Sequence, residues 1–292
     1  MNIALKKLGF DEHDRVLIIH ADDIGMCQAS VSGLADLFEF GLLSSAAVMA
    51  PCPWFEYAAD LARAHPAWDL GVHLTLNAEW TAYRWGPLST RDPASGLLDE
   101  QGYFHARPPA TEQQAELSAV RAELAAQARR ARAAGLDPTH LDAHMLTAAK
   151  PRFRSLYVAL ALEQRLPLLL IRERPGLSAL AGAMAAEPEL ADRLDAQGVP
   201  LFDDLLALPL DEPRDQVALA KKMIDALRPG LTMLILHPAQ DTPELRALAP
   251  DWASRVANAA AMLNAELRDH LRQSGVQVIG YRPLRGLLKA NS

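Results

Sequence analysis

The hydrophobic positions of the chain form short apolar runs separated by amphipathic stretches. The first run, Val16 to Ile19, leads directly into His20-Ala21-Asp22-Asp23 and then Gly25. Continuous apolar runs of this length are typical of interior strands in a parallel sheet, because such strands are covered on both faces. Further strands are predicted on the same grounds over residues 42–50, 70–76, 139–143, 166–171, 231–236 and 276–280.

Apolar residues at helical spacing fill most of the intervals. A helix over 28–40 is followed by Gly41, and Thr111 with Gln114 match a capping box for a helix that extends to Ala134. Further helices are expected over 54–64, 150–164, 211–227 and 252–273. Strands alternating with helices predict an α/β fold with about seven mainly parallel strands, as a barrel or a doubly wound sheet.

Two stretches break this alternation. Residues 77–110 show neither strand nor helix period, and residues 176–198 are alanine-rich, predicted to be helical, and interpreted as an insertion. The first stretch is a long loop that carries Trp80, Tyr83, Trp85, Tyr103 and Phe104. These rings could stack on a substrate such as a sugar or could only fix the loop to the body of the protein. With no repeat and no convincing linker, we expect a single domain over residues 1–292.

Composition narrows the class of protein. Of 292 residues, 50% are hydrophobic and the net charge is −7, which argues against nucleic-acid binding. No apolar run reaches the roughly 18 residues of a membrane helix, and residues 1–10 lack the apolar segment of a signal peptide. Cys27 and Cys52 show no disulfide-framework spacing. A cytoplasmic protein is therefore expected, and its alanine- and leucine-rich helices offer surfaces for a homodimer contact.

Polar residues of ligand type follow several of the predicted strands. They are Asp22, Asp23, His73, His140, Asp142, His144, Arg172, Arg174 and His237. Carboxyl ends of parallel strands share one edge or mouth, where ligand sites form. Two imidazoles and one carboxylate leave positions open for water and substrate on a divalent ion. Adjacent acids can serve as ligand and base, and the alternation of a strand would let only one readily face the ion.

Each residue also has a structural interpretation. The acid pair could cap a helix, His73 could be a hydrogen-bonded core histidine, and His237 could belong to a simple turn. The segment from His140 to His144 could be a half-buried strand with hydrogen-bonded polar side chains. Because four separate strand ends carry such residues, a site is favoured over four coincidences. The remaining histidines are treated as bystanders: His13, His65, His105 and His270.

Four segments in order resemble the motifs of a known family. The segments are 20–25, 71–76, 138–144 and 237–239, with the sequences HADDIG, GVHLTL, PTHLDAH and HPA. They are similar to the motifs of the YdjC-like family, which contains chitooligosaccharide deacetylases, and the resemblance extends from Arg15 to about Tyr281. It implies a (β/α) barrel-like fold, a distorted TIM barrel related to polysaccharide deacetylases.

The resemblance also implies an activity and a set of roles. It implies hydrolysis of an N-acetyl group on an amino sugar or oligosaccharide with the help of one divalent metal ion, magnesium or zinc. Asp23, His73 and His144 would hold the ion, Asp22 would act as base and His237 as general acid. The residues expected to support the ligands or bind substrate are His20, Asp142, His140, Arg172 and Arg174. Among them, Arg172 or Arg174 would orient Asp22 or bind substrate, and Asp142 would fix the tautomer of a ligand histidine.

The chain departs from the more familiar family pattern at three places. His20 stands where asparagine is usual, and Met145-Leu146 follow His144 where the family has further histidines. Residues 176–198 match no part of the pattern. Since His20 shares a strand face with Asp22, it is expected to tune that carboxylate's pKa or simply to fill the barrel.

Two other functions are compatible with the same residues. The ligand set is also that of a two-histidine, one-carboxylate iron oxygenase, although those enzymes usually have an all-β scaffold. A non-catalytic sugar-binding barrel is the other alternative. Metal analysis with oxygen uptake would distinguish the first, and tight oligosaccharide binding without hydrolysis would favour the second.

Overall fold

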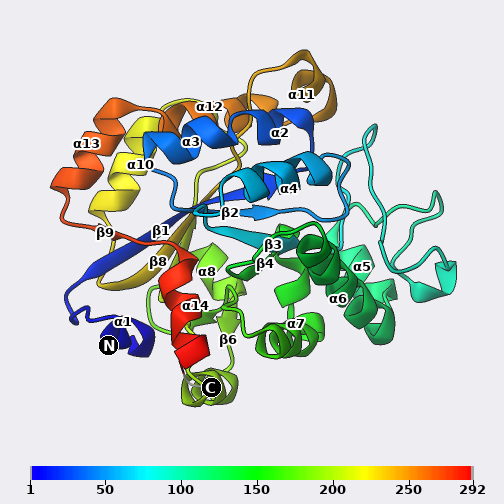
Figure 1. Ribbon diagram of the computed structural model, residues 1–292, viewed down its shortest axis with the longest axis horizontal. Coiled ribbons are helices and arrows are strands. Elements are labelled where there is room, and N and C mark those ends of the chain that lie inside the picture. Colours follow the sequence, from blue (N-terminus) through cyan, green and yellow to red (C-terminus); the bar gives the residue numbers. More distant parts are fainter. Residues whose placement is uncertain (1, 291–292) are drawn as a thin grey trace.

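The fold is built on a parallel sheet at the centre of the molecule (Figure 1). The structure, a computed structural model, describes residues 2–290. The strand order is β4-β3-β2-β1-β8-β7, with β9 beside β1, and every pairing is parallel. The strands are β1 (Arg15–Ile24), β2 (Ser45–Val48), β3 (Leu70–Leu74), β4 (Leu141–Ala143), β7 (Asp204–Ala207), β8 (Gly230–Leu236) and β9 (Gln277–Val278).

An irregular segment connects the two edges of this sheet. Isolated parallel bridges join Leu141 to Leu168 and Ile171 to Phe202, which links β4 to the chain just before β7. The regular part of this segment is only β5 (Ile171–Arg172), which also pairs with β6 (Ala185–Ala186). The prediction of a barrel-like α/β fold with about seven parallel strands is therefore confirmed, with one wall of the barrel weakly formed.

Helices cover the outside of the sheet. In Figure 1, α2, α3, α10, α12 and α13 lie above the strands, and α6 and α7 lie below them beside the 77–110 loop. The helices are α1 (Ile3–Lys7), α2 (Gln28–Ser32), α3 (Leu34–Phe40), α4 (Phe55–Ala64), α5 (Pro108–Gln114), α6 (Leu117–Ala133), α7 (Pro151–Gln164), α8 (Ala179–Ala183), α9 (Pro188–Ala196), α10 (Gln216–Asp225), α11 (Pro243–Leu248), α12 (Trp252–Met262), α13 (Ala265–Gln273) and α14 (Tyr281–Ala290). Two short 3₁₀ segments are η1 (Pro93–Ser95) and η2 (His144–Ala149).

Three of the helices expected from the sequence are interrupted. The break after α2 falls at Gly33, and Asn264 caps α13 by accepting a 3.0 Å hydrogen bond from the Leu267 amide. The proposed capping box at Thr111 is wrong. Prolines at the first turn begin α5 at Pro108 instead, and the Thr111 hydroxyl accepts a 2.9 Å bond from the Asn77 side chain.

The barrel interior is closed by a helix that the sequence pattern did not predict. Tyr281, the first residue of α14, is buried and stacks on the ring of His140 with 3.7 Å between centroids. Gly71 in β3 leaves the space that this imidazole occupies, since a Cβ there would lie 2.4 Å from the His140 ring. The small residue in β3 and the aromatic pair are therefore one packing unit.

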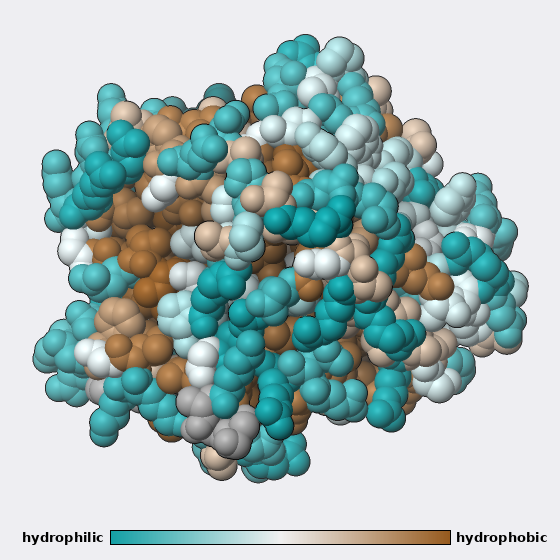
Figure 2. Space-filling view, in the orientation of Figure 1, coloured by the Kyte–Doolittle hydropathy of each residue, from teal (hydrophilic) through white to brown (hydrophobic). Residues whose placement is uncertain are grey.

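The 176–198 segment is less uniform than expected. It contains α8, the short strand β6 and α9 rather than one helix, and β6 pairs with β5. On the outer surface, apolar residues gather on the left of the view in Figure 2, the side where β9 lies in Figure 1; Val278 of β9 is 38% exposed. Within residues 2–290, no helix combines the length and apolar character needed to cross a membrane.

Candidate metal centre

The tip of β1 contains a bulge at the two adjacent acids. Ala21 lies opposite Ala46 in β2 and Ile24 lies opposite Val48, so three residue steps on β1 match two on β2. Asp23 has the left-handed φ of 64°, and an extra residue of this kind re-aims the side chains around it. The strand alternation predicted that one acid would face the ion while the other flanks it, and the bulge brings both carboxylates close to His73. A carboxylate oxygen of each lies within 3.9 Å of the His73 Nε2 atom.

The three predicted ligands converge on one point. Asp23 Oδ1 lies 3.4 Å from His73 Nε2 and 3.0 Å from His144 Nδ1, and all three side chains are buried. The donor atoms lie within 4.8 Å of one another, and Asp23 Oδ1 has no hydrogen-bond partner. A buried carboxylate oxygen facing two imidazole nitrogens is a donor set that fits a divalent cation.

Carboxylates hold both imidazoles in the required orientation. Asp142 Oδ1 accepts a 2.8 Å bond from His73 Nδ1, and Glu79 Oε2 accepts a 2.9 Å bond from His144 Nε2. Each bond leaves the other ring nitrogen free toward Asp23. Asp142 also belongs to two alternative acid–histidine groups, but both of its oxygens accept hydrogen bonds, whereas Asp23 Oδ1 is free. The set formed by Asp23, His73 and His144 is therefore the better metal site.

Arg255 in α12 holds the carboxylate of Asp23 in place. Its Nη1 donates a 2.8 Å hydrogen bond to Asp23 Oδ2, and its Nε donates a 2.9 Å bond to Asp251. Burial alone would raise the pKa of Asp23, but the adjacent His144 and Arg255 hold that pKa well below its usual range. Asp23 therefore remains a carboxylate.

Asp22 and His237 lie beside this set. Asp22 Oδ2 is 3.8 Å from His237 Nε2, while Asp22 Oδ1 is 3.1 Å from His20 Nε2. The His237 backbone amide donates to the Asn258 side chain at 2.9 Å, but its ring Nδ1 has no hydrogen-bond partner. Burial lowers the pKa of His237, against the opposing charges of Asp23 and Asp22. With 19% of its side chain exposed, this imidazole can still reach a bound molecule.

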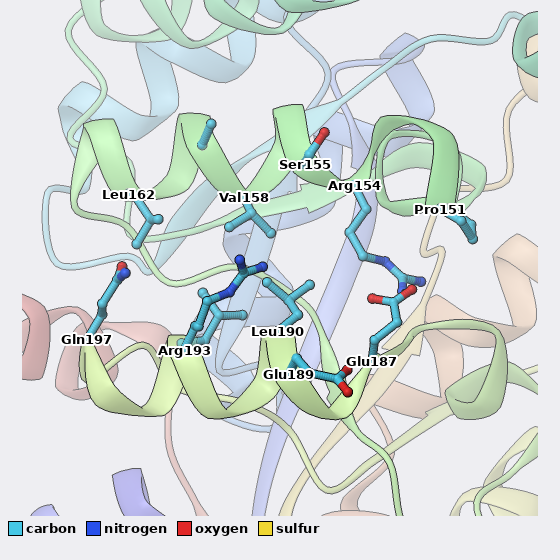
Figure 3. A pocket seen from close by; sticks show the side chains of 12 residues that line it. Pro151, Arg154, Ser155, Val158, Leu162, Glu187, Glu189, Leu190, Arg193 and Gln197 are labelled. Carbon is cyan, nitrogen blue, oxygen red and sulfur yellow. The ribbon is translucent and has the colours of Figure 1, made fainter.

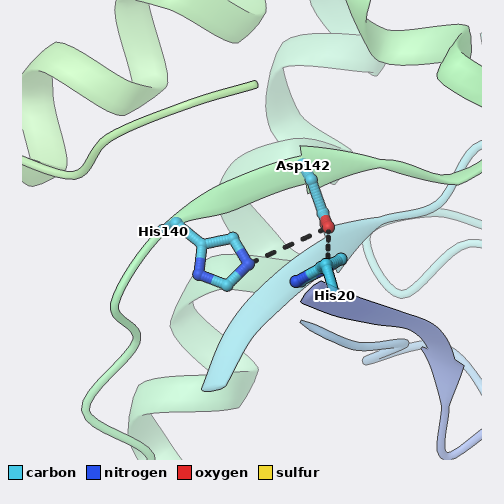
Figure 4. Close-up of side chains that lie close together, drawn as sticks. All are labelled: His20, His140 and Asp142. Carbon is cyan, nitrogen blue, oxygen red and sulfur yellow. Dashed lines mark hydrogen bonds and ion pairs between the residues drawn. The ribbon is translucent and has the colours of Figure 1, made fainter. Parts of the chain in front are cut away.

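Three buried side chains, His20, His140 and Asp142, lie close together in the barrel interior (Figure 4). Asp142 Oδ2 accepts a 2.7 Å bond from His20 Nε2, and the other His20 nitrogen lies 2.9 Å from the Ser45 hydroxyl. Burial would lower the pKa of His20, but its bonds to Asp142 and Asp22 raise it to about 9. Burial and the charge of His20 lower the pKa of His140 well below its usual value, so His140 serves as a neutral packing partner.

The structure does not bring Arg172 and Arg174 to this cluster. Arg172 pairs with Asp195 at 2.5 Å, and Arg174 Nη1 lies 4.0 Å from Asp203. Both arginines line a cavity with Gly230, which begins β8, whereas His237 follows the end of that strand. The expectation that one of them orients Asp22 is therefore wrong, because the short β5 pairs with Phe202, just before β7, and its arginines lie near the beginning of β8.

The aromatic residues of the 77–110 loop mostly fix it to the barrel. Trp80 and Trp85 are 4% and 3% exposed, and the Trp85 indole donates a 2.8 Å bond to the Asn77 carbonyl. Tyr83 donates to the Met26 carbonyl at 2.9 Å, and only Tyr103 of the five rings is strongly exposed, at 39%. The structural interpretation of these rings is therefore favoured over substrate stacking.

Two charged residues of the site could not be found from the sequence pattern. Glu79 lies in the irregular loop, 65 positions from His144, and Arg255 lies in a helix, 232 positions from Asp23. Glu79 lies in the loop after β3 and not at the strand end, and neither residue belongs to a local motif. Their roles depend on tertiary packing alone.

A separate cavity of about 600 Å³ lies between α7 and α9 (Figure 3). Val158 faces Leu190 across it, Leu162 lies opposite Gln197 at one end, and Arg154 pairs with Glu187 at 2.7 Å at the other. None of the acids or histidines described above lines this cavity. The chemistry is therefore concentrated at the strand ends and not in this groove.

Comparison with known proteins agrees with the geometry. Residues 16–273 match the family described as YdjC-like protein. The chain belongs to this family. It is 35% identical to a carbohydrate deacetylase of Thermus thermophilus over 90% of this chain and 92% of the relative. It is 32% identical to a chitooligosaccharide deacetylase of Yersinia enterocolitica over 54% of this chain and 60% of that relative.

A solved structure supports the fold of this YdjC-like chain. The crystal structure of an Enterococcus faecalis protein described as a cellobiose-phosphate cleavage protein superposes on this chain with a TM-score of 0.74 and 24% sequence identity. The match covers 93% of this chain and 99% of that chain. The overall fold of the chain is therefore a known architecture.

Proposed function

We propose that this chain is a metal-dependent carbohydrate deacetylase, which hydrolyses the N-acetyl group of an amino sugar or oligosaccharide. The observation that carries the proposal is the convergence of Asp23, His73 and His144, with Asp22 and His237 close beside them. The names of the relatives from Thermus thermophilus and Yersinia enterocolitica support an acetylated carbohydrate as the substrate class.

The donor set favours a metal of the zinc type. Imidazole nitrogens suit zinc, whereas magnesium prefers oxygen donors and keeps several waters. When bound, such an ion supplies Lewis-acid chemistry, because it polarises a carbonyl group and makes a water molecule easier to deprotonate. Three protein ligands leave room for both.

The proton transfers are assigned to Asp22 and His237. Asp22 Oδ2 takes a proton from the attacking water, while Asp22 Oδ1 lies 3.1 Å from His20 Nε2. Asp22 Oδ2 is 3.8 Å from His237 Nε2, a separation that one bridging water molecule would span, so the proton would pass through that water to the imidazole and from there to the departing nitrogen. Water is consumed, the amide C–N bond breaks, and the products are acetate and a free amine.

Asp142 connects the proposed metal ligands to the residues proposed to transfer protons. One oxygen accepts a hydrogen bond from His73, a proposed metal ligand, and the other from His20, whose Nε2 also lies 3.1 Å from the proposed base Asp22. Replacing His20 by asparagine would therefore disturb Asp22 without removing a ligand. This assigns His20 a supporting role in addition to filling the barrel.

The test measures metal content and acetate release together. Protein purified without chelator is analysed for bound metal, and acetate is followed with N-acetylglucosamine oligomers as substrate. We expect His73→Ala to lose both metal and acetate release, while Asp22→Asn keeps the metal and loses acetate release. His65→Ala is the matched control, because His65 stacks on Trp68 outside the site. Full acetate release by metal-free His73→Ala would overturn the proposal.

A further inference from the structure

We infer that Glu79 is a positioning residue for the metal ligand His144, and that it couples the 79–85 segment of the long loop to the metal ion. This inference rests on the metal site of the proposed function. It assigns a role to a loop whose aromatic residues otherwise only fix it to the barrel, and it predicts that the ion and the loop stabilise each other.

The contact between Glu79 and His144 determines which ring nitrogen faces the site. Glu79 Oε2 and His144 Nε2 are 2.9 Å apart, and their side chains are 13% and 4% exposed. The opposite ring nitrogen, Nδ1, lies 3.0 Å from Asp23 Oδ1. In the neutral ring, a proton on Nε2 donated to Glu79 leaves the lone pair on Nδ1, which is the nitrogen that would bind a metal.

The backbone around His144 gives the ring little other support. His144 follows the three-residue strand β4, and the next residues, Met145 and Leu146, have left-handed φ values of 51° and 58°. His73 differs, because it lies within β3 and its partner Asp142 is on the adjacent strand. One ligand is therefore held by the barrel and the other by the loop.

The same loop segment also contacts Arg255, the residue that holds the second ligand, Asp23. The Trp80 ring lies 5.4 Å from the Arg255 guanidinium, which donates to Asp23 Oδ2. The Trp85 ring lies 6.3 Å from the ring of His144. Two of the three ligands thus depend on residues 79–85, and linkage requires that a bound ion order the loop as much as the loop favours the ion.

The primary test is zinc binding by calorimetry on the full-length, metal-free protein. We expect Glu79→Met, which keeps the side-chain volume without an acceptor, to weaken zinc binding roughly 10- to 100-fold. Glu79→Gln, which retains an acceptor oxygen, should recover most of the affinity. Asp92→Asn is the matched control, because Asp92 lies in the same loop but outside the 79–85 segment, and its carboxylate accepts a 2.9 Å hydrogen bond from the Ala94 amide.

Hydrogen exchange gives a second measurement, made on the wild-type protein and on Glu79→Met. Zinc should slow amide exchange over residues 79–85 of the wild-type protein more than over residues 96–103, and this difference should vanish in Glu79→Met. Wild-type zinc affinity in folded Glu79→Met would overturn the inference, and so would equal exchange over both segments with and without zinc.

These outcomes separate the inference from the proposed activity. If the wild-type protein releases no acetate but Glu79→Met weakens zinc binding, the positioning role stands and the deacetylase activity is rejected. If the wild-type protein releases acetate but Glu79→Met binds zinc with unchanged affinity, the activity stands and the positioning role is rejected.

Discussion

Two groups of strand ends can be compared, those of β1, β3, β4 and β8 and that of β5. The first group brings acids and histidines within 4 Å of one another at the candidate metal centre. The end of β5 carries Arg172 and Arg174, which pair locally with Asp195 and Asp203 near the start of β8. Both groups show the same pattern in the sequence, an apolar run followed by charge.

The difference lies in how the strands pair. β1 is paired with β8 over seven consecutive residues from Arg15 to Ala21, and β3 pairs with β4 at His73 and Asp142. β5 is two residues long and connects with the barrel through isolated bridges. A polar residue after an apolar run therefore reaches the common mouth only when its strand is in register with its neighbours.

The largest expected difference between the two groups is in catalysis. Asp22→Asn should lower the rate of acetate release by roughly 10²- to 10⁴-fold, because it removes the general base. Arg174→Gln should leave that rate within about twofold, since Arg174 lies near the start of β8. Steady-state kinetics with metal content as the control measures both, and a comparable loss in Arg174→Gln would contradict the comparison.

A stability difference follows from the buried pair of Arg255 and Asp23. Arg255→Met should lower the free energy of unfolding by roughly 3–5 kcal/mol in metal-free protein, because a fully buried carboxylate loses its cation. Urea unfolding in the presence of chelator measures this change. A loss below about 1 kcal/mol would show that Asp23 is compensated in another way.

The packing of the barrel interior gives a smaller effect. Gly71→Ala should cost roughly 1–3 kcal/mol, since the added Cβ would displace the His140 ring, which is itself stacked on Tyr281. Gly182→Ala in α8 is the matched control, because a Cβ there meets no atom within 4 Å. That variant should be neutral or slightly stabilising in thermal unfolding, as alanine favours a helix.

The smallest effect is expected at the end of β5. Arg172→Met should change the free energy of unfolding by no more than about 1 kcal/mol, because the pair with Asp195 is partly exposed, at 29% and 16%. The same urea titration measures it. A loss as large as that of Arg255→Met would mean that β5 anchors the barrel after all.

The sequence predicted a structural element correctly where the residue types and their periodicity indicated the same element. Continuous apolar runs predicted β1, β2, β3 and β8, and the ligand-type residues after β1, β3 and β4 do lie together. β7 was missed because Asp203 and Asp204 interrupt its apolar run; the Asp203 carboxylate accepts the Leu231 amide at 2.8 Å. Glu79 and Arg255 were missed because only the folded chain brings them to their partners.

The bulge in β1 has a further consequence, which concerns the number of residues in the strand. Between Ala21 and Ile24, three residue steps of β1 lie opposite two residue steps of β2. This extra residue is what turns both carboxylates toward the site. Deleting one residue there would restore ordinary pairing and leave a single acid at the tip, even if the remaining residue were aspartate. In this segment, chain length is as strict a requirement as chemical identity, so substitutions should be tolerated more readily than any insertion or deletion.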